Sequence, residues 1–217
     1  AVAALGAAAR DSGAQAFVYT SGIWVLGPTS GADEHAPVNP TPLVAFRPAH
    51  EQAALAFDTP TLRALVVRPG VVYGGGRGIV GDMLRDAENG IMRVIGTGEN
   101  HWPLVYDRDL ADLYVRLVTS PEARGIYHAT DDTALTVGEI AAAIAAHAQQ
   151  RPDIRFMPLA EARAKMGPYA DALALDQVVR SPRARALGWQ PTLGSIVNNV
   201  PRLFEEWRNA RTEDRAS

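Results

Sequence analysis

Two continuous apolar runs stand out in the N-terminal third of the chain. They span Ala16 to Thr20 (AFVYT) and Leu62 to Arg68 (LRALVVR), and continuous runs of this length are typical of strands buried on both faces of a parallel sheet. Between them, a helix is predicted from Pro48 to about Phe57, because proline fits the first turn of a helix. The order strand, helix, strand predicts a βαβ unit with a right-handed crossover.

The rest of the chain shows mostly helical periodicity. Further helices are predicted over residues 1–10, 78–88, 137–147, 159–166, 182–187 and 195–209. Short strands are predicted over 92–95 and 126–129. Asp107 or Asp109 is expected to cap another helix with leucines along one face. Thr136 and Glu139 have the spacing of a capping box. The Gly- and Pro-rich stretch 27–42 is predicted to be a long loop, and long loops are usually functional.

Composition narrows the classes of function. The 217 residues are 47% hydrophobic, carry a formal net charge of −3 and include no cysteine, which excludes disulfides, thiolate metal sites and a cysteine nucleophile. Arginines are dispersed, so a nucleic-acid partner is not expected. No apolar run reaches about 18 residues and no leader pattern is present, so we expect a cytoplasmic protein without a membrane span.

Several common site types lack their motifs. A hydrolase nucleophile elbow needs Gly-x-Ser-x-Gly, which does not occur. The phosphate loop of nucleotide hydrolases needs a lysine after its glycines, but the chain has one lysine, Lys165, and it is not so placed. The five histidines occur singly, without the spacing of metal ligands, so no metal is expected.

Three segments resemble the extended short-chain dehydrogenase/reductase family, which includes NAD-dependent epimerases and dehydratases. The first is FVYTSGIWVLG (17–27), and the second, more specific one is LVVRPGVVYGGG (65–76). The third is VIGTGENHWPLVYDRDLADLYV (94–115). Weaker support comes from 125–129 and 189–191, and the likeness extends from about residue 14 to residue 203.

The resemblance implies an α/β fold: a partial Rossmann-like parallel sheet with helices on both faces and a smaller, mostly helical C-terminal substrate region. Residues 1–73 would form the C-terminal part of an NAD(P)-binding domain. Residues 74–217 would form the substrate region, with a helix near 105–124 returning to the core. The family's Gly-x-x-Gly-x-x-Gly turn is not found, and the glycines at 74–78 read as a connector. The chain therefore looks like the C-terminal two-thirds of a family member.

The family's catalytic Tyr-x-x-x-Lys pair falls on Phe46 and His50. Phenylalanine has no proton to give, so the resemblance implies an atypical member with an unidentified proton donor. His50 is interpreted as a catalytic and cofactor-binding residue that replaces the ribose-binding lysine. The alternative is a partly exposed helix residue next to Glu51.

The family's catalytic serine falls near Gly22, and the nearest hydroxyls are Ser21 and Thr20. We interpret Ser21 as catalytic and Thr20 as cofactor-binding; the alternative is that both only satisfy the backbone at the strand end. Residues 69–71 (Pro69, Gly70 and Val71) are expected to line the nicotinamide of NAD or NADP.

Substrate contacts are assigned to Arg77, His101 and Trp102, against the alternatives of a solvated arginine and packing under a loop. These features predict an NAD(P)-dependent oxidoreductase or epimerase-like enzyme for a small hydroxyl- or carbonyl-bearing metabolite. The alternative is a non-catalytic dinucleotide-binding sensor or scaffold. A homodimer through helices near 1–11 and 48–57 is also expected from the resemblance.

Overall fold

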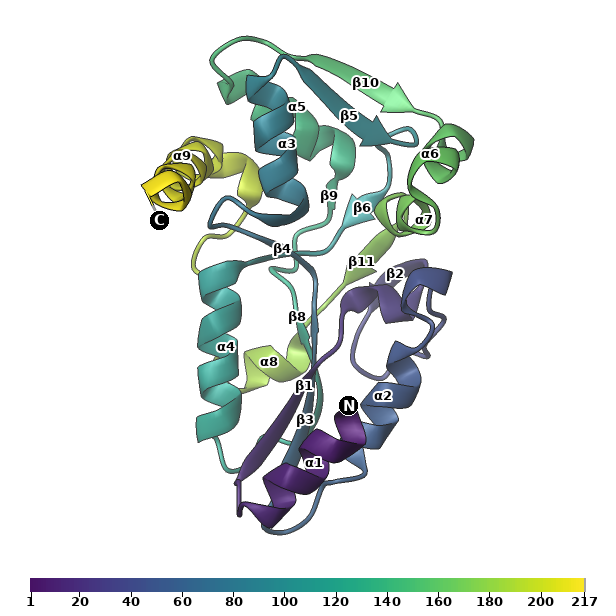
Figure 1. The fold of residues 1–217 in the computed structure, drawn as a ribbon, viewed down its shortest axis with the longest axis vertical. Helices are drawn as coiled ribbons and strands as arrows, with labels where there is room; N and C mark the ends of the chain where they lie inside the picture. Colours follow the sequence, from purple (N-terminus) through teal and green to yellow (C-terminus); the bar gives the residue numbers. More distant parts are fainter. Residues whose placement is uncertain (217) are drawn as a thin grey trace.

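The computed structural model describes residues 1–216 and shows a parallel sheet between two helical layers at one end of the molecule (Figure 1). The sheet has three strands in the order β1–β3–β8. They are β1 (Ala16–Thr20), β3 (Arg63–Pro69) and β8 (Gly125–Ala129). One face is covered by α1 (Val2–Asp11) and α2 (Arg47–Leu55), the other by α4 (Asp107–Thr119) and α8 (Pro182–Ala186). The predicted βαβ unit is thus confirmed.

The central strand β3 supplies side chains to both helical layers. All seven of its residues are buried. Leu65 and Val67 pack with leucines of α4, whereas Val66 packs with Ala54 of α2 on the opposite face. This two-sided burial explains the continuous apolar run. Strand β1 is only half-buried, because β3 is its one strand partner within the described residues.

The second group of strands and helices lies at the other end of the molecule (Figure 1). Its strands form pairs: β4 (Val71–Tyr73) with β7 (Leu104–Tyr106), β5 (Ile91–Ile95) with β10 (Asp153–Met157), β6 (His101–Trp102) with β9 (Leu135–Thr136), and β2 (Thr29–Ala32) with β11 (Gln177–Val179). Its helices are α3 (Gly78–Glu88), α5 (Val137–His147), α6 (Leu159–Met166), α7 (Tyr169–Leu173) and α9 (Val200–Ala216). Short 3₁₀ turns span Ile23–Leu26, Pro42–Val44 and Ile196–Asn198.

Only helices were predicted after residue 150, at 159–166, 182–187 and 195–209, but the structure also has two strands there. Strand β10 pairs with β5, and strand β11 pairs with β2, which lies inside the stretch predicted to be a loop. Both are short strands with partners far away in the sequence. Their hydrogen bonds, rather than any local hydrophobic pattern, make them strands, so periodicity could not reveal them.

Two helix starts were predicted, with different outcomes. The capping box before α5 is confirmed: Glu139 N donates to Thr136 Oγ1 at 3.1 Å, and Thr136 N donates to Glu139 Oε2 at 2.8 Å. The cap by Asp107 or Asp109 is wrong, because α4 begins after Tyr106 without a side-chain cap. Asp109 instead accepts the Thr192 hydroxyl at 2.6 Å, which ties α4 to the C-terminal segment.

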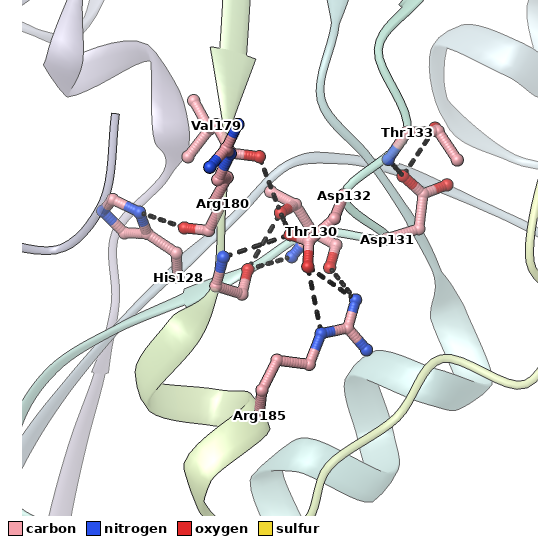
Figure 2. Close-up of polar contacts among 9 residues, drawn as sticks. His128, Thr130, Asp131, Asp132, Thr133, Val179, Arg180 and Arg185 are labelled. Atoms are coloured by element: carbon pink, nitrogen blue, oxygen red, sulfur yellow. Dashed lines mark hydrogen bonds and ion pairs between the residues drawn. The ribbon is translucent and has the colours of Figure 1, made fainter. Parts of the chain in front are cut away.

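Polar contacts, buried at Thr130 and Ser181 and partly exposed at Arg185, join the end of β8 to β11 and α8 (Figure 2). The hydroxyls of Thr130 and Ser181 lie 2.8 Å apart, and Thr130 Oγ1 donates to Asp132 Oδ1 at 3.0 Å. Arg185 Nε and Nη2 donate to the other carboxylate oxygen at 3.0 and 2.9 Å. Asp132 has a φ of 62°, which is unusual for a residue other than glycine. Its bonds on both sides hold it there.

A buried ion pair ties β3 to α2 next to a neutral histidine. Arg68 Nε donates to Glu51 Oε1 at 3.0 Å, and the two side chains are 3% and 4% exposed. His128 Nδ1 lies 3.1 Å from the carbonyl oxygen of Arg180, so this nitrogen carries the proton, and Nε2 faces Arg68 Nη1 at 3.5 Å. Burial, together with the nearby Arg68 charge, lowers the pKa of His128 to about 4.

His128 should make the protein less stable in mild acid. Below about pH 6.5 the unfolded chain binds a proton at His128, which the folded state does not bind until about pH 4. The free energy of unfolding therefore decreases as the pH falls from about 6.5 to about 4. The slope approaches about 1 kcal/mol per pH unit. Urea unfolding at pH 7 and pH 5 should show the stability of His128→Gln approaching that of the natural protein.

The buried carboxyl of Asp131 titrates with the opposite sign, since burial raises its pKa to about 6. It is present in both proteins, so its effect cancels when they are compared. An unchanged difference between pH 7 and pH 5 would contradict a neutral, buried His128.

The backbone at Gly70, between β3 and β4, leaves no room for a side chain. A Cβ there would lie 2.4 Å from the Pro103 carbonyl oxygen, whereas a Cβ at Gly22 would meet only the Arg47 guanidinium at 4.0 Å. We expect Gly70→Ala to destabilise the fold by about 1 to 3 kcal/mol, because backbone atoms would have to move. Gly22→Ala should change stability by less than about 1 kcal/mol. Thermal unfolding of the two variants checks this, and equal effects would contradict it.

Candidate functional site

A cavity of about 330 Å³ lies at the carboxyl ends of β1 and β3, and we call it the strand-end cavity. Parallel strands end at one edge of a sheet, where ligands of open α/β folds usually bind. The lining residues are Thr20, Ser21, Gly22, Ile23, Trp24, Arg47, Pro69, Gly70, Val71, Val72, Gly78 and Ile79. Thr20 and Ser21 follow one strand, and residues 69–71 follow the other. The structure therefore brings five of the predicted site residues together.

Ser21 lines the strand-end cavity and has a buried hydroxyl. The residue is 5% exposed, its backbone N–H donates to the Val67 carbonyl at 2.8 Å, and its Oγ has no hydrogen-bond partner within residues 1–216. An unpaired buried hydroxyl is costly unless a ligand pairs with it. Thr20 differs, because its hydroxyl lies 2.6 Å from the Tyr114 hydroxyl. Of the two hydroxyls, that of Ser21 is therefore the one available to donate a hydrogen bond to a ligand oxygen.

Arg47, at the N-terminus of α2, was missed by the sequence analysis. Its Nη1 donates to the Thr20 carbonyl at 3.2 Å, and its Nε is buried without a partner in the described part of the chain. It is also the one charged side chain among the residues that line the strand-end cavity. The sequence held one indication of a role for Arg47, which is that it directly follows Phe46. The family motif had been placed on positions 46 and 50, so Arg47 between them was not considered.

Phe46 and His50 lie beside the strand-end cavity rather than among its lining residues. The Phe46 side chain is 53% exposed and meets the His50 ring edge-on at 5.3 Å between centroids. His50 Nδ1 lies 3.3 Å from the Tyr19 hydroxyl. This contact leaves Nε2 as the nitrogen of His50 that can bind a ligand.

A second cavity, of about 220 Å³, lies in the other half of the molecule. We call it the methionine cavity, after three of the residues that line it. The lining residues are Ile79, Asp82, Met83, Asp86, Arg93, Val94, Ile95, Trp102, Val137, Met157, Met166, Tyr169 and Leu173. Trp102 is 5% exposed, and its Nε1 donates to the Leu173 carbonyl at 3.0 Å. Its indole ring therefore forms a fixed part of the wall.

The other two predicted substrate residues line neither cavity. His101 Nδ1 lies 2.8 Å from Asp176 Oδ1, and its backbone N–H donates to the same oxygen at 2.8 Å. Arg77 is exposed and immediately precedes α3. The two neighbours that follow it, Gly78 and Ile79, do line the strand-end cavity.

Two kinds of feature do not occur in the described residues. No group of three or more His, Cys, Asp or Glu side chains is placed there to hold a metal ion. No helix in that part of the chain is both long and apolar enough to cross a membrane.

Comparison with known proteins identifies the family. Residues 1–130, more than half of the chain, match the NAD dependent epimerase/dehydratase family. An uncharacterized protein of Schizosaccharomyces pombe is 31% identical over 156 residues, which cover 69% of this chain and 52% of that protein. The bovine epimerase family protein SDR39U1 is 28% identical over 192 residues, covering 86% of this chain and 65% of the relative. The chain thus spans about half to two-thirds of the length of these relatives.

Solved structures share the fold. Human SDR39U1 (isoform 2) with NADPH superposes with a TM-score of 0.82 at 24% identity, covering 94% of this chain and 70% of that one. MoeE5 in complex with UDP-glucose and NAD gives a TM-score of 0.81 at 17% identity, covering 96% and 70%. The predicted Rossmann-like α/β class is therefore confirmed. Since the family model matches more than half of its residues, this chain belongs to the NAD-dependent epimerase/dehydratase family.

Proposed function

We propose that the protein is an NAD(P)-dependent oxidoreductase or epimerase-like enzyme for a small hydroxyl- or carbonyl-bearing metabolite. The observation that carries this proposal is that Ser21 and Arg47 line the strand-end cavity together with residues 69–71, and each has a buried polar atom, Oγ or Nε, with no hydrogen-bond partner in the described residues. Family membership and the NADPH and NAD in the similar solved structures support it.

The strand-end cavity fits the nicotinamide end of a dinucleotide. Pro69, Gly70 and Val71 supply a largely apolar wall, and Thr20 and Ser21 face it from the other strand. His50 would hold a ribose hydroxyl through Nε2, while Nδ1 stays with Tyr19. When bound, the cofactor would supply or accept a hydride.

Ser21 and Arg47 would act on the reacting oxygen of the substrate. The Ser21 hydroxyl donates a hydrogen bond to that oxygen, and the guanidinium of Arg47 stabilises the negative charge that develops on it. Arginine stays protonated in proteins, so Arg47 cannot be the proton donor. No histidine or carboxylic acid is among the residues found to line the strand-end cavity. We therefore assign proton delivery to water through the Ser21 hydroxyl.

The remaining proposals concern the surroundings of this site. Trp102 would contact the substrate from the methionine cavity, with Arg77 and His101 approaching it when ligand is bound. Helices α1 and α2 pack side by side, and Leu5 of α1 is an exposed hydrophobic residue. The surface of these two helices is the proposed homodimer interface. The cytoplasm remains the proposed location.

A second candidate function is a non-catalytic dinucleotide-binding sensor or scaffold. The observation that favours it is Phe46, which is exposed at the position of the family's catalytic tyrosine and cannot transfer a proton. Hydride transfer by the natural sequence would exclude this alternative.

Arg47→Met should lower kcat/KM for NAD(P)-dependent turnover by about 100-fold, because a charged donor to the reacting oxygen is lost. Arg47→Lys should retain part of the activity, since it keeps the charge without the fork of donors. The measurement is the change in nicotinamide absorbance in the full-length protein. Arg10→Met, which removes an exposed arginine in α1, is the matched control. Equal kcat/KM values for Arg47→Met and the control would refute the role of Arg47.

His50→Ala should weaken cofactor binding about tenfold, because a hydrogen bond to the ribose is lost. The measurement is a fluorescence titration of the full-length protein with NADPH and with NADH. Gln52→Ala changes an exposed residue of the same helix and should leave the affinity unchanged. If His50→Ala binds both cofactors like the natural protein, the ribose role is wrong.

A further inference from the structure

The strand-end cavity and the methionine cavity are neighbours in the structure. Ile79, in the first turn of α3, lines both of them. A second link is a ring contact: Trp24 of the strand-end cavity meets Tyr169 of the methionine cavity edge-on, with 6.2 Å between ring centroids. A substrate whose reacting oxygen lies at Ser21 and which reaches beyond Ile79 would meet the methionine cavity next.

The wall of the methionine cavity is mostly apolar. Ten of its thirteen residues are hydrophobic or aromatic, among them three of the four methionines in the chain. Methionine side chains are flexible and polarizable, so they adapt to apolar ligands of irregular shape. Apolar pockets with few polar groups select ligands mainly by the surface that they bury.

The charged residues of this wall are unfavourable for phosphate. They are Asp82, Asp86 and Arg93, so carboxylates outnumber the basic group. Arg85 is not a lining residue, and its guanidinium is already engaged by both aspartates, at 2.6 Å from Asp82 and 3.5 Å from Asp86, so it does not add a basic group for a phosphate. A nucleoside diphosphate carries at least two negative charges, and binding it usually requires several basic groups or backbone N–H donors.

We propose that the methionine cavity binds an uncharged apolar part of the substrate, an alkyl chain or a ring, so that the substrate is a hydrophobic ketone or alcohol rather than a nucleotide sugar. This inference rests on the proposed function for the position of the reacting oxygen. The volume of about 220 Å³ suits such a group, since a dry apolar cavity of about 150 Å³ can hold benzene. MoeE5, which shares the fold at 17% identity, was solved with UDP-glucose. The substrate class proposed for this chain differs from that ligand.

The methionines allow a direct test without cofactor. With ¹³C-labelled methionine methyl groups, 2-octanone should shift the NMR signals of Met83, Met157 and Met166. Met92 is buried in the core and is not among the lining residues, so its signal should stay in place and serve as an internal control. UDP-glucose at the same concentration should shift none of the four. Shifts with UDP-glucose and none with the ketone would overturn the proposal.

Affinity should follow the apolar length of the ligand. Each buried methylene strengthens binding about fourfold, so 2-octanone should bind roughly 15-fold more tightly than 2-hexanone in calorimetric titrations. Met166→Glu adds a third carboxylate to the wall and should weaken ketone binding at least about tenfold. Ala164→Glu places the same charge on an exposed position of α6 and should bind like the natural protein. Circular dichroism of each variant checks that it is folded.

If Met166→Glu does not fold, Met157→Trp, which fills the same cavity, replaces it with the same expected loss. Affinities that do not depend on ketone length, or equal affinities for the cavity variant and Ala164→Glu, would overturn the proposal. NAD(P)-dependent turnover in the full-length protein separates this inference from the proposed function. Ketone binding without any turnover would refute the proposed reaction and support the apolar cavity. Turnover that does not vary with the apolar length of the ketone would support the proposed reaction and refute the apolar cavity as the substrate site.

Discussion

The buried ion pair between Arg68 and Glu51 is the interaction on which the geometry of the candidate site depends. Arg68 directly precedes Pro69 at the end of β3, and Glu51 lies one helical turn after Arg47 on α2. The pair thus joins the helix that carries the guanidinium to the strand that carries the apolar wall. Removing one partner of such a pair leaves an unpaired buried charge, which costs about 3 to 5 kcal/mol. A shift of α2 along β3 would break the pair and incur a comparable cost.

The site combines the architecture of its family with altered chemistry. Helix α2 and its N-cap, where the resemblance places the family's tyrosine and lysine, have an exposed Phe46, a His50 in contact with Tyr19, and Arg47 in the cavity wall. A permanently charged guanidinium can stabilise negative charge but cannot exchange protons. In the proposed reaction this site would act by charge stabilisation, with the proton supplied by water.

The sequence allowed accurate prediction where local chemistry decides the outcome. The apolar run of β3 is buried on both faces, and the Thr136 capping box forms with its neighbour Glu139, so both signals are contained in a few adjacent residues. Strands β10 and β11 were missed because their partners, β5 and β2, are distant in the chain. Asp109 was assigned to a cap because its other partner, Thr192, could not be foreseen.

For this protein, the apolar runs alone predicted the βαβ unit of the parallel sheet, and the resemblance of three segments indicated the family and a shared site for Ser21 and residues 69–71. These residues meet because parallel strands end at the same edge. Only the tertiary structure decided which side chain of α2 faces the cavity: Arg47 rather than Phe46 or His50. It also decided that three methionines from separate elements line one apolar space beside that cavity. The physical reason is that the direction of a side chain depends on how its helix or strand docks, which is set by contacts between residues far apart in the sequence.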